Sequence, residues 1–384
     1  MARRTPNPRV IDSNLQSLRT FARVDLRAVQ RNFRAIRNAA DGETAILAVV
    51  KADAYGHGAV EVAGALANAG ADRFAVACIE EGVELRRAGI AGEIAIFGGL
   101  LPGSEPLAAQ HSLTPFIQTA EQLCAWQREA ESRNAKLACH LEIDSGMTRT
   151  GLSVECTDEL AKLIAQAPNV TIEGIGTHLA SAENFADPLA EEQIGRFSAL
   201  VGQLAALGIR PRFTHHANSA AIAYGRTSGT NMVRPGLALF GYVNPAVGQS
   251  VVGRLELEPA MEWKARIVAT REVAAGAVLG YDATYRAGRP MRIGVVSAGY
   301  GDGLDRRMSN GGIVMVGESE CAIVGLISMD VTLIDLSSVP EAAPGDEVTL
   351  LGKQWNAWRM AEHCDTIPYE ILCGISKRVP RVYD

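Results

Sequence analysis

Short runs of apolar residues recur through the first 240 or so residues of the chain. Each run is bounded by glycine, proline or polar residues, a pattern typical of strands that are buried on both faces of a parallel sheet. There are eight such runs, at 45–50, 74–79, 94–97, 113–117, 137–143, 171–176, 212–216 and 233–240.

Between several of these runs lie segments whose apolar residues repeat every three or four positions, as in amphipathic helices. The clearest is 191–207, which Gly208 follows as a stop signal. Weaker patterns predict helices at 121–135 and 158–167, and a further helix at 26–38 precedes the first strand. This alternation predicts an α/β fold with a (β/α)8 TIM-type barrel. An open doubly wound sheet is the alternative, but the count of eight favours a closed barrel.

The pattern changes near residue 250, where short β-branched runs separated by Gly, Pro, Asp and Asn replace the strand-helix alternation. They predict a mostly antiparallel β domain, with strands at 266–272, 291–297, 312–316, 322–327, 331–336 and 347–351. A chain of 384 residues is also long for a single core. We therefore expect a flexible N-terminal arm at 1–15, a barrel at 16–250 and a β domain at 251–384, with the boundary inside 248–256.

Composition and charge exclude several classes of protein. The net charge is −6 and no long basic run is present, so we expect no nucleic-acid partner. The basic N-terminus has no apolar segment after it, and no apolar run approaches the ~20 residues that span a bilayer, so we expect a cytoplasmic protein without a membrane segment. The seven scattered cysteines include no CxxC pair, which argues against a disulfide framework or a structural metal site.

Lys51 directly follows the first predicted strand and is the most informative single residue. Burying an ammonium group costs free energy and usually lowers its pKa, which makes the amine a nucleophile that forms Schiff bases with carbonyls and with pyridoxal phosphate. Gly56 and Gly58 allow a tight turn after it. Taken alone, Lys51 also fits a surface lysine whose stem lies along the strand.

Polar residues gather at the ends of other predicted strands, where TIM barrels carry their catalytic groups. They are Asp144, Ser145, Gly146, Met147 and Arg149 after the fifth strand, Thr177 and His178 after the sixth, His216, Asn218 and Ser219 after the seventh, and Arg234 in the eighth. Each has an ordinary structural explanation by itself, such as a core histidine or an ion-paired arginine. Their joint placement at one rim favours an active site.

Asn218 and Ser219 precede a short apolar segment at 220–224. Ser219 is a natural helix N-cap, and helix N-termini bind phosphate through their free N–H groups. Barrels often bind phosphate in the loops after strands seven and eight, where Gly236 would add a backbone donor. A simple cap without a ligand is the alternative for Ser219.

The segment Ala48-Val49-Val50-Lys51-Ala52-Asp53-Ala54-Tyr55-Gly56-His57-Gly58 resembles the pyridoxal-phosphate signature of alanine racemases. Similar segments follow in family order at 140–151, 177–178, 216–219, 231–236, 281–285, 299–303, 328–330 and 367–381. The resemblance implies a barrel and a β domain in a head-to-tail homodimer with shared active sites. It also implies interconversion of L- and D-alanine with pyridoxal 5'-phosphate, for D-alanine supply to the peptidoglycan cell wall or for alanine catabolism.

The resemblance assigns a role to each candidate residue. Lys51 would be the Schiff-base lysine and one of two catalytic bases, and Tyr285 of the partner subunit would be the other. His178 would polarise that tyrosine, and Arg234 would face the pyridine nitrogen. The remaining contacts would be Tyr55, Asn218, Ser219, Gly236 and Tyr369 at the phosphate side of the cofactor, Arg149 at its phenolic oxygen and the substrate, Met329 at the substrate carboxylate, and Tyr281 and Tyr300 at the entry.

One position departs from the family pattern. Many members carry a lysine, typically carbamylated, where this chain has Glu142. Our hypothesis is that the Glu142 carboxylate replaces the carbamate and pairs with Arg149. The change leaves strict specificity for alanine open.

Three other functions fit parts of the sequence. A broader-specificity amino-acid racemase shares the same residues. Related pyridoxal-phosphate decarboxylases tend to be longer and use a β-domain cysteine, for which Cys373 is a weak candidate, whereas Tyr285 and 328–330 favour racemisation. A non-catalytic pyridoxal-phosphate-binding protein of the single-barrel type would lack the second domain.

Overall fold

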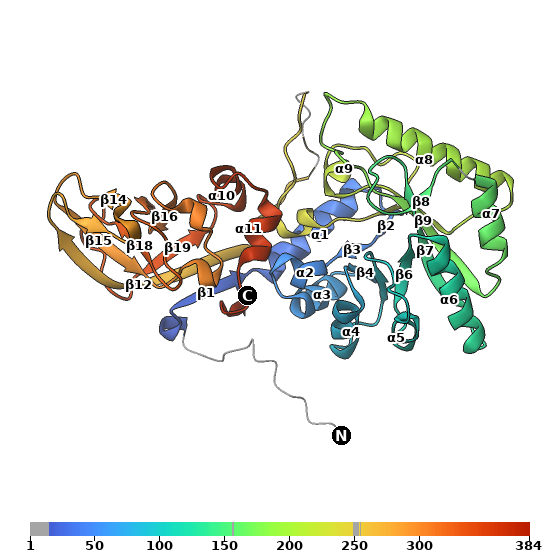
Figure 1. Ribbon diagram of the computed structural model, residues 1–384, viewed down its shortest axis with the longest axis horizontal. Coiled ribbons are helices and arrows are strands. Elements are labelled where there is room, and N and C mark those ends of the chain that lie inside the picture. Colours follow the sequence, from blue (N-terminus) through green and yellow to red (C-terminus); the bar gives the residue numbers. More distant parts are fainter. Residues whose placement is uncertain (1–14, 156, 249–252, 254) are drawn as a thin grey trace, which may run out of the picture. The chain divides into compact units, whose positions relative to one another are not determined.

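The computed structural model describes residues 15–155, 157–248, 253 and 255–384. Contacts divide the chain into two units (Figure 1). The barrel unit comprises Val29–Ala54 and Ala59–Glu258, and the β unit comprises Met1–Ala28, Tyr55–Gly58 and Pro259–Asp384. Nearly all of the predicted arm and much of the predicted boundary segment lie outside the described residues.

The barrel unit is built on parallel strands whose spatial order follows the chain. They are β2 (Ala45–Ile46), β3 (Ala48–Val49), β4 (Arg73–Val76), β5 (Glu93–Ile96), β6 (Thr114–Ile117), β7 (Leu137–Asp144), β9 (Val170–Thr177), β10 (Phe213–His215) and β11 (Met232–Val233), with β8 (Leu152–Ser153) beside β7. Pairing runs from β3 through β4, β5, β6, β7 and β9 to β10, and β11 pairs with β2.

Two backbone hydrogen bonds link β10 to β11 and complete the ring. The N–H of Asn231 donates to the Thr214 carbonyl at 3.0 Å, and the N–H of Arg234 donates to the Ala217 carbonyl at 2.8 Å. Since Leu47 joins β2 to β3 and donates to the Val233 carbonyl, these two short strands act as one. Among the described residues the barrel therefore has eight strands, which confirms the predicted (β/α)8 class.

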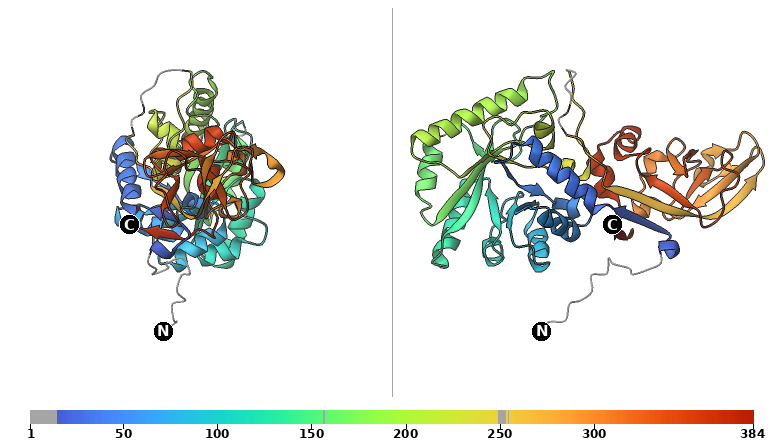
Figure 2. Two further views of the ribbon diagram at one scale, coloured as in Figure 1. Left: turned by 90° about the vertical axis from the view of Figure 1, so that its left-hand side faces the viewer. Right: turned by 180° about the vertical axis from the view of Figure 1, so that it is seen from behind.

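Helices accompany these strands, and α3 to α8 lie along the outside of the parallel sheet (Figure 2). The helices are α1 (Leu26–Ala39), α3 (Ala59–Asn68), α4 (Ile79–Arg87), α5 (Glu105–Gln110), α6 (Ala120–Ser132), α7 (Thr157–Ala165), α8 (Leu189–Ala206) and α9 (Ser219–Ala223), whereas α2 (Lys51–Tyr55) is a short turn with left-handed backbone. The predicted helix at 191–207 corresponds to α8, which buries Phe197, Leu200 and Leu204.

The last predicted barrel strand, 233–240, is wrong over most of its length. Only Met232–Val233 is strand, and Leu237–Phe240 forms a buried 3-10 helix, η2. Pro235 has no N–H to donate to a ladder, and the chain leaves the sheet after the Pro235 carbonyl has accepted from the N–H of Val49 at 2.9 Å. A short apolar run does not distinguish a buried strand from a buried helical turn.

The β unit is a mostly antiparallel sheet structure, as predicted. Its strands are β1 (Thr20–Val24), β12 (Met261–Val273), β15 (Met291–Val296), β16 (Ile313–Val316), β17 (Ser319–Ala322), β18 (Thr332–Asp335), β19 (Glu347–Leu351) and β20 (Arg381–Tyr383), with the hairpin β13 (Val278–Leu279) and β14 (Tyr285–Arg286). The short helices α10 (Ala357–His363) and α11 (Pro368–Gly374) follow β19.

Strand β1 belongs to this unit although the sequence pattern grouped it with the barrel. It pairs antiparallel with β12, with Thr20 opposite Ala265, and parallel with β20, with Ala22 opposite Arg381. Such pairing joins segments that lie at opposite ends of the chain, so local periodicity carried no sign of it.

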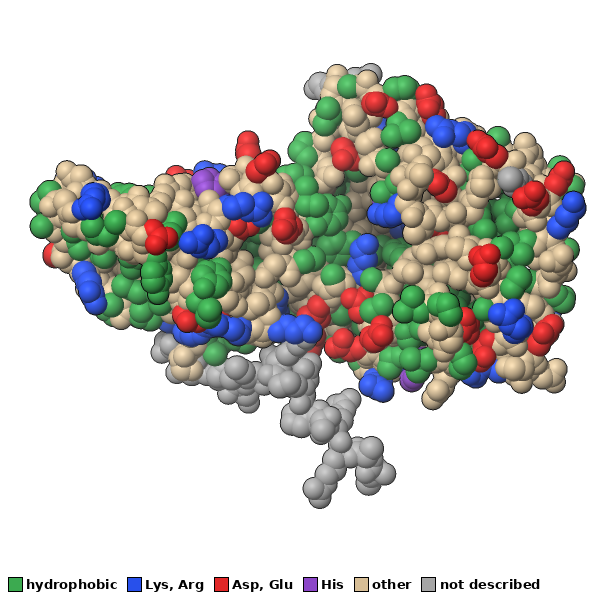
Figure 3. Space-filling model, viewed as in Figure 1, with side chains coloured by type: hydrophobic (Ala, Val, Ile, Leu, Met, Phe, Trp, Pro, Cys, Tyr) green, Lys and Arg blue, Asp and Glu red, His purple; other side chains and the backbone are tan. Residues whose placement is uncertain are grey.

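The surface and the helix lengths add two observations. Acidic and basic side chains are interspersed over the face drawn in Figure 3. In the part of the chain that the structure describes, none of the helices has both the length and the apolar content to cross a membrane.

Candidate active site

Lys51 lies where the chain leaves β3, and an unusual backbone turn follows it. Residues 52–55 all have φ between 53° and 55°, a left-handed conformation that costs L-residues about 1–2 kcal/mol each. Glu81 on α4 compensates, because its carboxylate accepts hydrogen bonds from the N–H of Ala52 at 2.6 Å and of Ala77 at 2.8 Å. The hydrogen bonds of Glu81 therefore allow residues other than glycine to adopt this left-handed turn. Lys51, just before the turn, is partly buried at the strand end.

The end of this turn is packed within the β unit. Gly56 has φ 81°, and a Cβ there would lie 2.4 Å from the Leu372 carbonyl oxygen, so only glycine fits. The buried Tyr55 ring lies 5.8 Å from the ring of Tyr369, centroid to centroid. The two tyrosines predicted at the phosphate side are therefore neighbours.

Arg234 is buried and donates hydrogen bonds to two histidines. Its Nη1 lies 2.6 Å from His215 Nδ1, and its Nη2 lies 3.3 Å from His178 Nδ1 and 2.7 Å from the Thr177 carbonyl oxygen. A guanidinium has donors only, so both Nδ1 atoms must accept. The structure thus brings together Arg234 and His178, which the sequence predicted at one rim.

His178 is held neutral. Burial and the positive charges of Arg234, Arg149 and Lys51 lower its pKa to about 3. Since its Nδ1 accepts from Arg234, the single ring proton resides on Nε2. His178 therefore presents an N–H donor, not a charged acid, at neutral pH.

Glu142 and Arg149 line one narrow cavity at the ends of β7 and β9. The cavity is lined by Glu142, Ile143, Asp144, Met147, Arg149, Thr150, Thr177 and His178. Burial raises the pKa of Glu142 to about 7, although the charges of Arg234 and Arg149 oppose this. Within the described residues no ion pair closer than 4.0 Å joins Glu142 to Arg149, so the two charges act on each other without the expected direct pairing.

Ser219 is not the helix cap that the sequence predicted. Asn218 caps α9, with its Oδ1 accepting from the N–H of Ala221 at 3.0 Å, and Ser219 is the first helical residue. Both residue types cap well, so the sequence did not decide between them. The Ser219 Oγ instead accepts from the N–H groups of Gly236 at 3.0 Å and Ala238 at 3.1 Å, which leaves its O–H free to donate.

The other predicted site residues belong to the β unit. Tyr285 on β14 is partly buried and packs against a cluster of Leu279, Ala287, Met291, Ile293 and Val324. Tyr281, Tyr300 and Met329 are 68%, 45% and 51% exposed. The N–H of Tyr300 donates to the Ser328 carbonyl and that of Gly301 donates to the Met329 carbonyl, so Tyr300 and Met329 are brought together.

A buried carboxylate that the sequence did not single out holds the loop carrying Tyr300. Asp302 is 0% exposed, accepts from the Gly299 N–H at 3.1 Å and forms ion pairs with Arg19 and Arg378. Glu81 was missed in the same way, although two adjacent glutamates just after the second predicted strand were a local signal. The partners that give these carboxylates their roles, Ala52 for Glu81 and Arg19 and Arg378 for Asp302, are remote in sequence.

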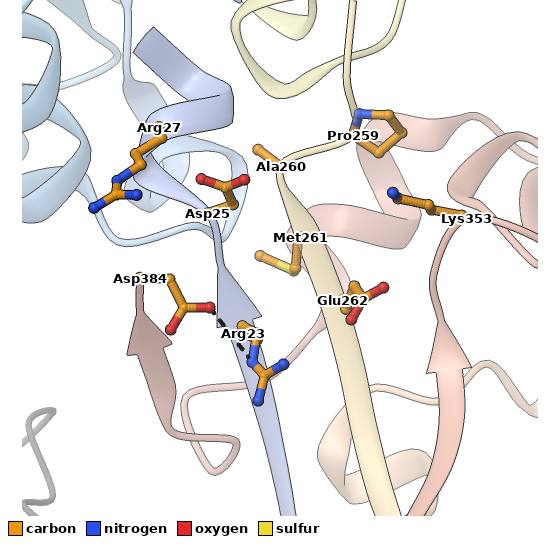
Figure 4. Close-up of a pocket in the computed structure, with 9 residues that line it drawn as sticks. All are labelled: Arg23, Asp25, Arg27, Pro259, Ala260, Met261, Glu262, Lys353 and Asp384. Carbon is orange, nitrogen blue, oxygen red and sulfur yellow. Dashed lines mark ion pairs between the residues drawn. The ribbon is translucent and has the colours of Figure 1, made fainter. Parts of the chain in front are cut away.

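One further predicted residue and one cavity lie in the β unit. Cys373 lies exposed on α11. A cavity of about 490 Å³ in the β unit involves none of the predicted site residues (Figure 4). It is lined by Arg23, Asp25, Arg27, Pro259, Ala260, Met261, Glu262, Lys353 and Asp384.

Fold and site together define a barrel enzyme with an amine, a guanidinium and a neutral imidazole at the carboxyl ends of its strands. Models of the alanine racemase N-terminal and C-terminal domains match residues 24–245 and 260–383. The chain belongs to the alanine racemase family.

Individual relatives agree over almost the whole length. A curated alanine racemase of Symbiobacterium thermophilum is 39% identical over 371 residues, covering 95% of this chain and 97% of the relative. The solved alanine racemase of Clostridium difficile 630 superimposes with a TM-score of 0.90 at 34% identity, covering 96% of each chain. That of Bartonella henselae, solved with covalently bound pyridoxal phosphate, has a TM-score of 0.87 at 30% identity, covering 96% of this chain and 100% of that chain.

Proposed function

We propose that this enzyme interconverts L-alanine and D-alanine with pyridoxal 5'-phosphate, using Lys51 and Tyr285 of the partner subunit as two bases. The observation that carries the proposal is the position of Lys51 at the end of β3, with its charge acting on the same His178 that Arg234 contacts. Racemisation needs a base on each face of the substrate Cα, and two chemically different bases serve one enantiomer each.

The residues present fit the cofactor. A lysine amine suits its aldehyde, and the Ser219 hydroxyl, which already accepts two N–H groups, has its own O–H to donate to a phosphate oxygen. Gly236, Asn218, Tyr55 and Tyr369 would complete this phosphate side. When bound, pyridoxal phosphate supplies an electron sink that lowers the cost of removing the α-proton.

His178 would prepare the partner subunit's Tyr285 for its role. A tyrosine hydroxyl has an ordinary pKa near ~10 and is a weak base at neutral pH. The neutral His178 carries its proton on Nε2, and an N–H donated to the tyrosine oxygen favours the phenolate. Arg234 orients His178 through the other ring nitrogen.

Three charged residues would set the electrostatics of the site. Arg234 is a donor only, so facing the pyridine nitrogen it would leave that nitrogen without a proton of its own. Arg149 would contact the phenolic oxygen and the substrate. Glu142, in the same cavity, would supply part of the negative charge that balances the two arginines, because with a pKa of about 7 its carboxyl is partly ionised at neutral pH.

A homodimer follows from the assignment of Tyr285 to the partner subunit. The exposed Tyr281, Tyr300 and Met329 support it, because large exposed apolar side chains are typical of surfaces that another chain or a ligand covers. Met329 would contact the substrate carboxylate, and Tyr281 and Tyr300 would line the entry. We place the enzyme in the cytoplasm, where it would supply D-alanine for peptidoglycan.

The test is a chiral assay of L-alanine, L-serine and a basic amino acid, with and without added pyridoxal phosphate. We expect racemisation of alanine, strengthened by the cofactor, and its loss in Lys51→Ala together with the imine absorption band. Tyr285→Phe should slow exchange of the α-proton unequally for the two enantiomers. Racemisation of serine or the basic amino acid at rates like alanine would favour the broader-specificity enzyme, and equal effects of Tyr285→Phe would contradict the two-base assignment.

A further inference from the structure

Two fully buried histidines, His140 on β7 and His215 on β10, meet across the intervening strand β9. Both are 0% exposed, and His140 Nδ1 lies 2.9 Å from His215 Nε2. They meet over glycines: a Cβ at Gly174 would lie 2.2 Å from His140 Nδ1, and one at Gly176 would lie 2.0 Å from the His215 ring. The Phe116 ring stacks on His140 with centroids 5.0 Å apart. The two glycines and this ring therefore form a slot that fits the two imidazoles.

The hydrogen bonds of this pair allow only one arrangement of protons. Arg234 donates to His215 Nδ1 at 2.6 Å, so His215 must carry its proton on Nε2. That proton is donated to His140 Nδ1, and His140 therefore carries its own proton on Nε2. A second proton on either ring would place two N–H groups against each other. Burial and the charge of Arg234 also lower the pKa of His215.

The chain of donors ends at a carboxylate. His140 Nε2 lies 3.0 Å from Glu93 Oε1 at the start of β5, and the other carboxylate oxygen, Oε2, lies 3.4 Å from Nε of Arg73. Glu93 is 17% exposed, and the imidazole rings of His140 and His215 connect it to Arg234. The guanidinium at one end and the carboxylate at the other thus fix the direction of every hydrogen bond between them.

We propose that Glu93 is a remote positioning residue that fixes the tautomers of His140 and His215 and thereby the orientation of Arg234. Arg234 imposes this order from one end, but without an acceptor at position 93 the Nε2–H of His140 is buried without a partner, a cost that His140 avoids by carrying its proton on Nδ1 and turning away from His215. His215 then loses its fixed partner, and the guanidinium loses one of the contacts that aim it. The tautomer assignment stands on the contacts alone, whereas the consequence for catalysis rests on the proposed racemase function.

The direct test is nitrogen-15 NMR of the full chain with labelled histidines, loaded with pyridoxal phosphate, at neutral pH. We expect His140 and His215 to be neutral and protonated on Nε2, with assignments made from His140→Gln and His215→Gln. In Glu93→Met, which keeps the length of the side chain but has no acceptor for an N–H, the His140 tautomer should become mixed. Glu93→Gln retains an amide oxygen and should preserve the natural tautomers. A proton on Nδ1 of either histidine in the natural protein, or unchanged tautomers in Glu93→Met, would overturn the proposal.

Racemisation of alanine gives the second measurement. Glu93→Met should lower kcat by about tenfold, equivalent to ~1.4 kcal/mol, while Glu93→Gln stays within about twofold. The matched control is Glu173→Met. Glu173 lies on β9 and pairs with Arg212, so this variant removes a carboxylate without touching a histidine. An equal loss in Glu93→Met and Glu173→Met would assign Glu93 a purely structural role and overturn the proposal. A natural protein without racemase activity would instead refute the proposed function and leave the NMR test intact.

Discussion

The N–H of Ala52 lies 2.6 Å from a carboxylate oxygen of Glu81, so a side chain 29 positions further along holds the first residue after Lys51. The second oxygen of Glu81 accepts from the N–H of Ala77, which ties the ends of two neighbouring strands to one side chain. The left-handed turn after Lys51 is therefore stabilised by the side chain of Glu81, which lies outside the turn on α4.

Glu81→Ala should release this turn. It leaves two backbone donors without their acceptor, and we expect a loss of about 2–3 kcal/mol in the free energy of unfolding, with weaker retention of pyridoxal phosphate. Urea denaturation and cofactor absorbance measure the two effects. Glu84→Ala removes an exposed carboxylate from the same helix and is the control. Similar losses in both variants would contradict a special role for Glu81.

Gly174→Ala tests the slot that holds the two histidines. The added Cβ would lie 2.2 Å from His140 Nδ1, so the imidazole must move, and we expect about 2 kcal/mol or more of destabilisation together with loss of activity. Gly195→Ala on α8 is the control, since its Cβ would have no atom within 4 Å. There the higher helix propensity of alanine should be neutral or stabilising by ~0.5–1 kcal/mol. Thermal unfolding of both variants measures the difference in stability. If Gly174→Ala leaves stability unchanged, the close fit between Gly174 and His140 does not stabilise the fold.

Glu142 should make stability depend on pH. Its pKa in the folded protein is about 7, above the ordinary value of 4.5, so the folded state binds the proton more tightly. The stabilisation is complete below pH 4.5 and is lost as pH rises through about 7. It amounts to about 2 kcal/mol, less than the full shift in pKa implies, because Glu142 keeps some exposure to solvent. The natural protein should therefore lose stability relative to Glu142→Gln between these pH values.

Denaturation of both proteins across this range measures the difference, and Glu159→Gln, at an exposed position on α7, is the control. A pH-independent difference between Glu142→Gln and the natural protein would mean that the Glu142 carboxyl is not buried as described.

Asp302→Ala should destabilise the β unit and loosen the loop that carries Tyr300. The buried carboxylate contacts Arg19, Arg378 and the Gly299 N–H, and loss of such a centre costs about 3 kcal/mol. Asp330→Ala removes an exposed partner of the same Arg378 and should cost less than about 1 kcal/mol. Chemical denaturation followed by tryptophan fluorescence compares them. Equal losses of stability in the two variants would show that burial of the Asp302 carboxylate does not contribute to the free energy of unfolding.

The sequence by itself determined the strand-helix alternation, the β-rich C-terminal part and the place of Lys51 after a buried strand. These features depend on neighbours a few positions apart, which share one strand or one helical turn. It also placed His178 and Arg234 at one rim, because the ends of parallel strands meet at the same edge of a barrel. It did not decide between Asn218 and Ser219 as the cap, or that 237–240 would leave the sheet.

Only the tertiary structure decided the contacts that hold these residues. The bond between His140 and His215 spans 75 positions, and β1 pairs with a strand more than two hundred residues away. Strand order and register determine which side chains meet, and both are set by packing of the whole chain. For that reason the roles of Glu81, Glu93 and Asp302, which hold residues on other elements, became visible only in the folded protein.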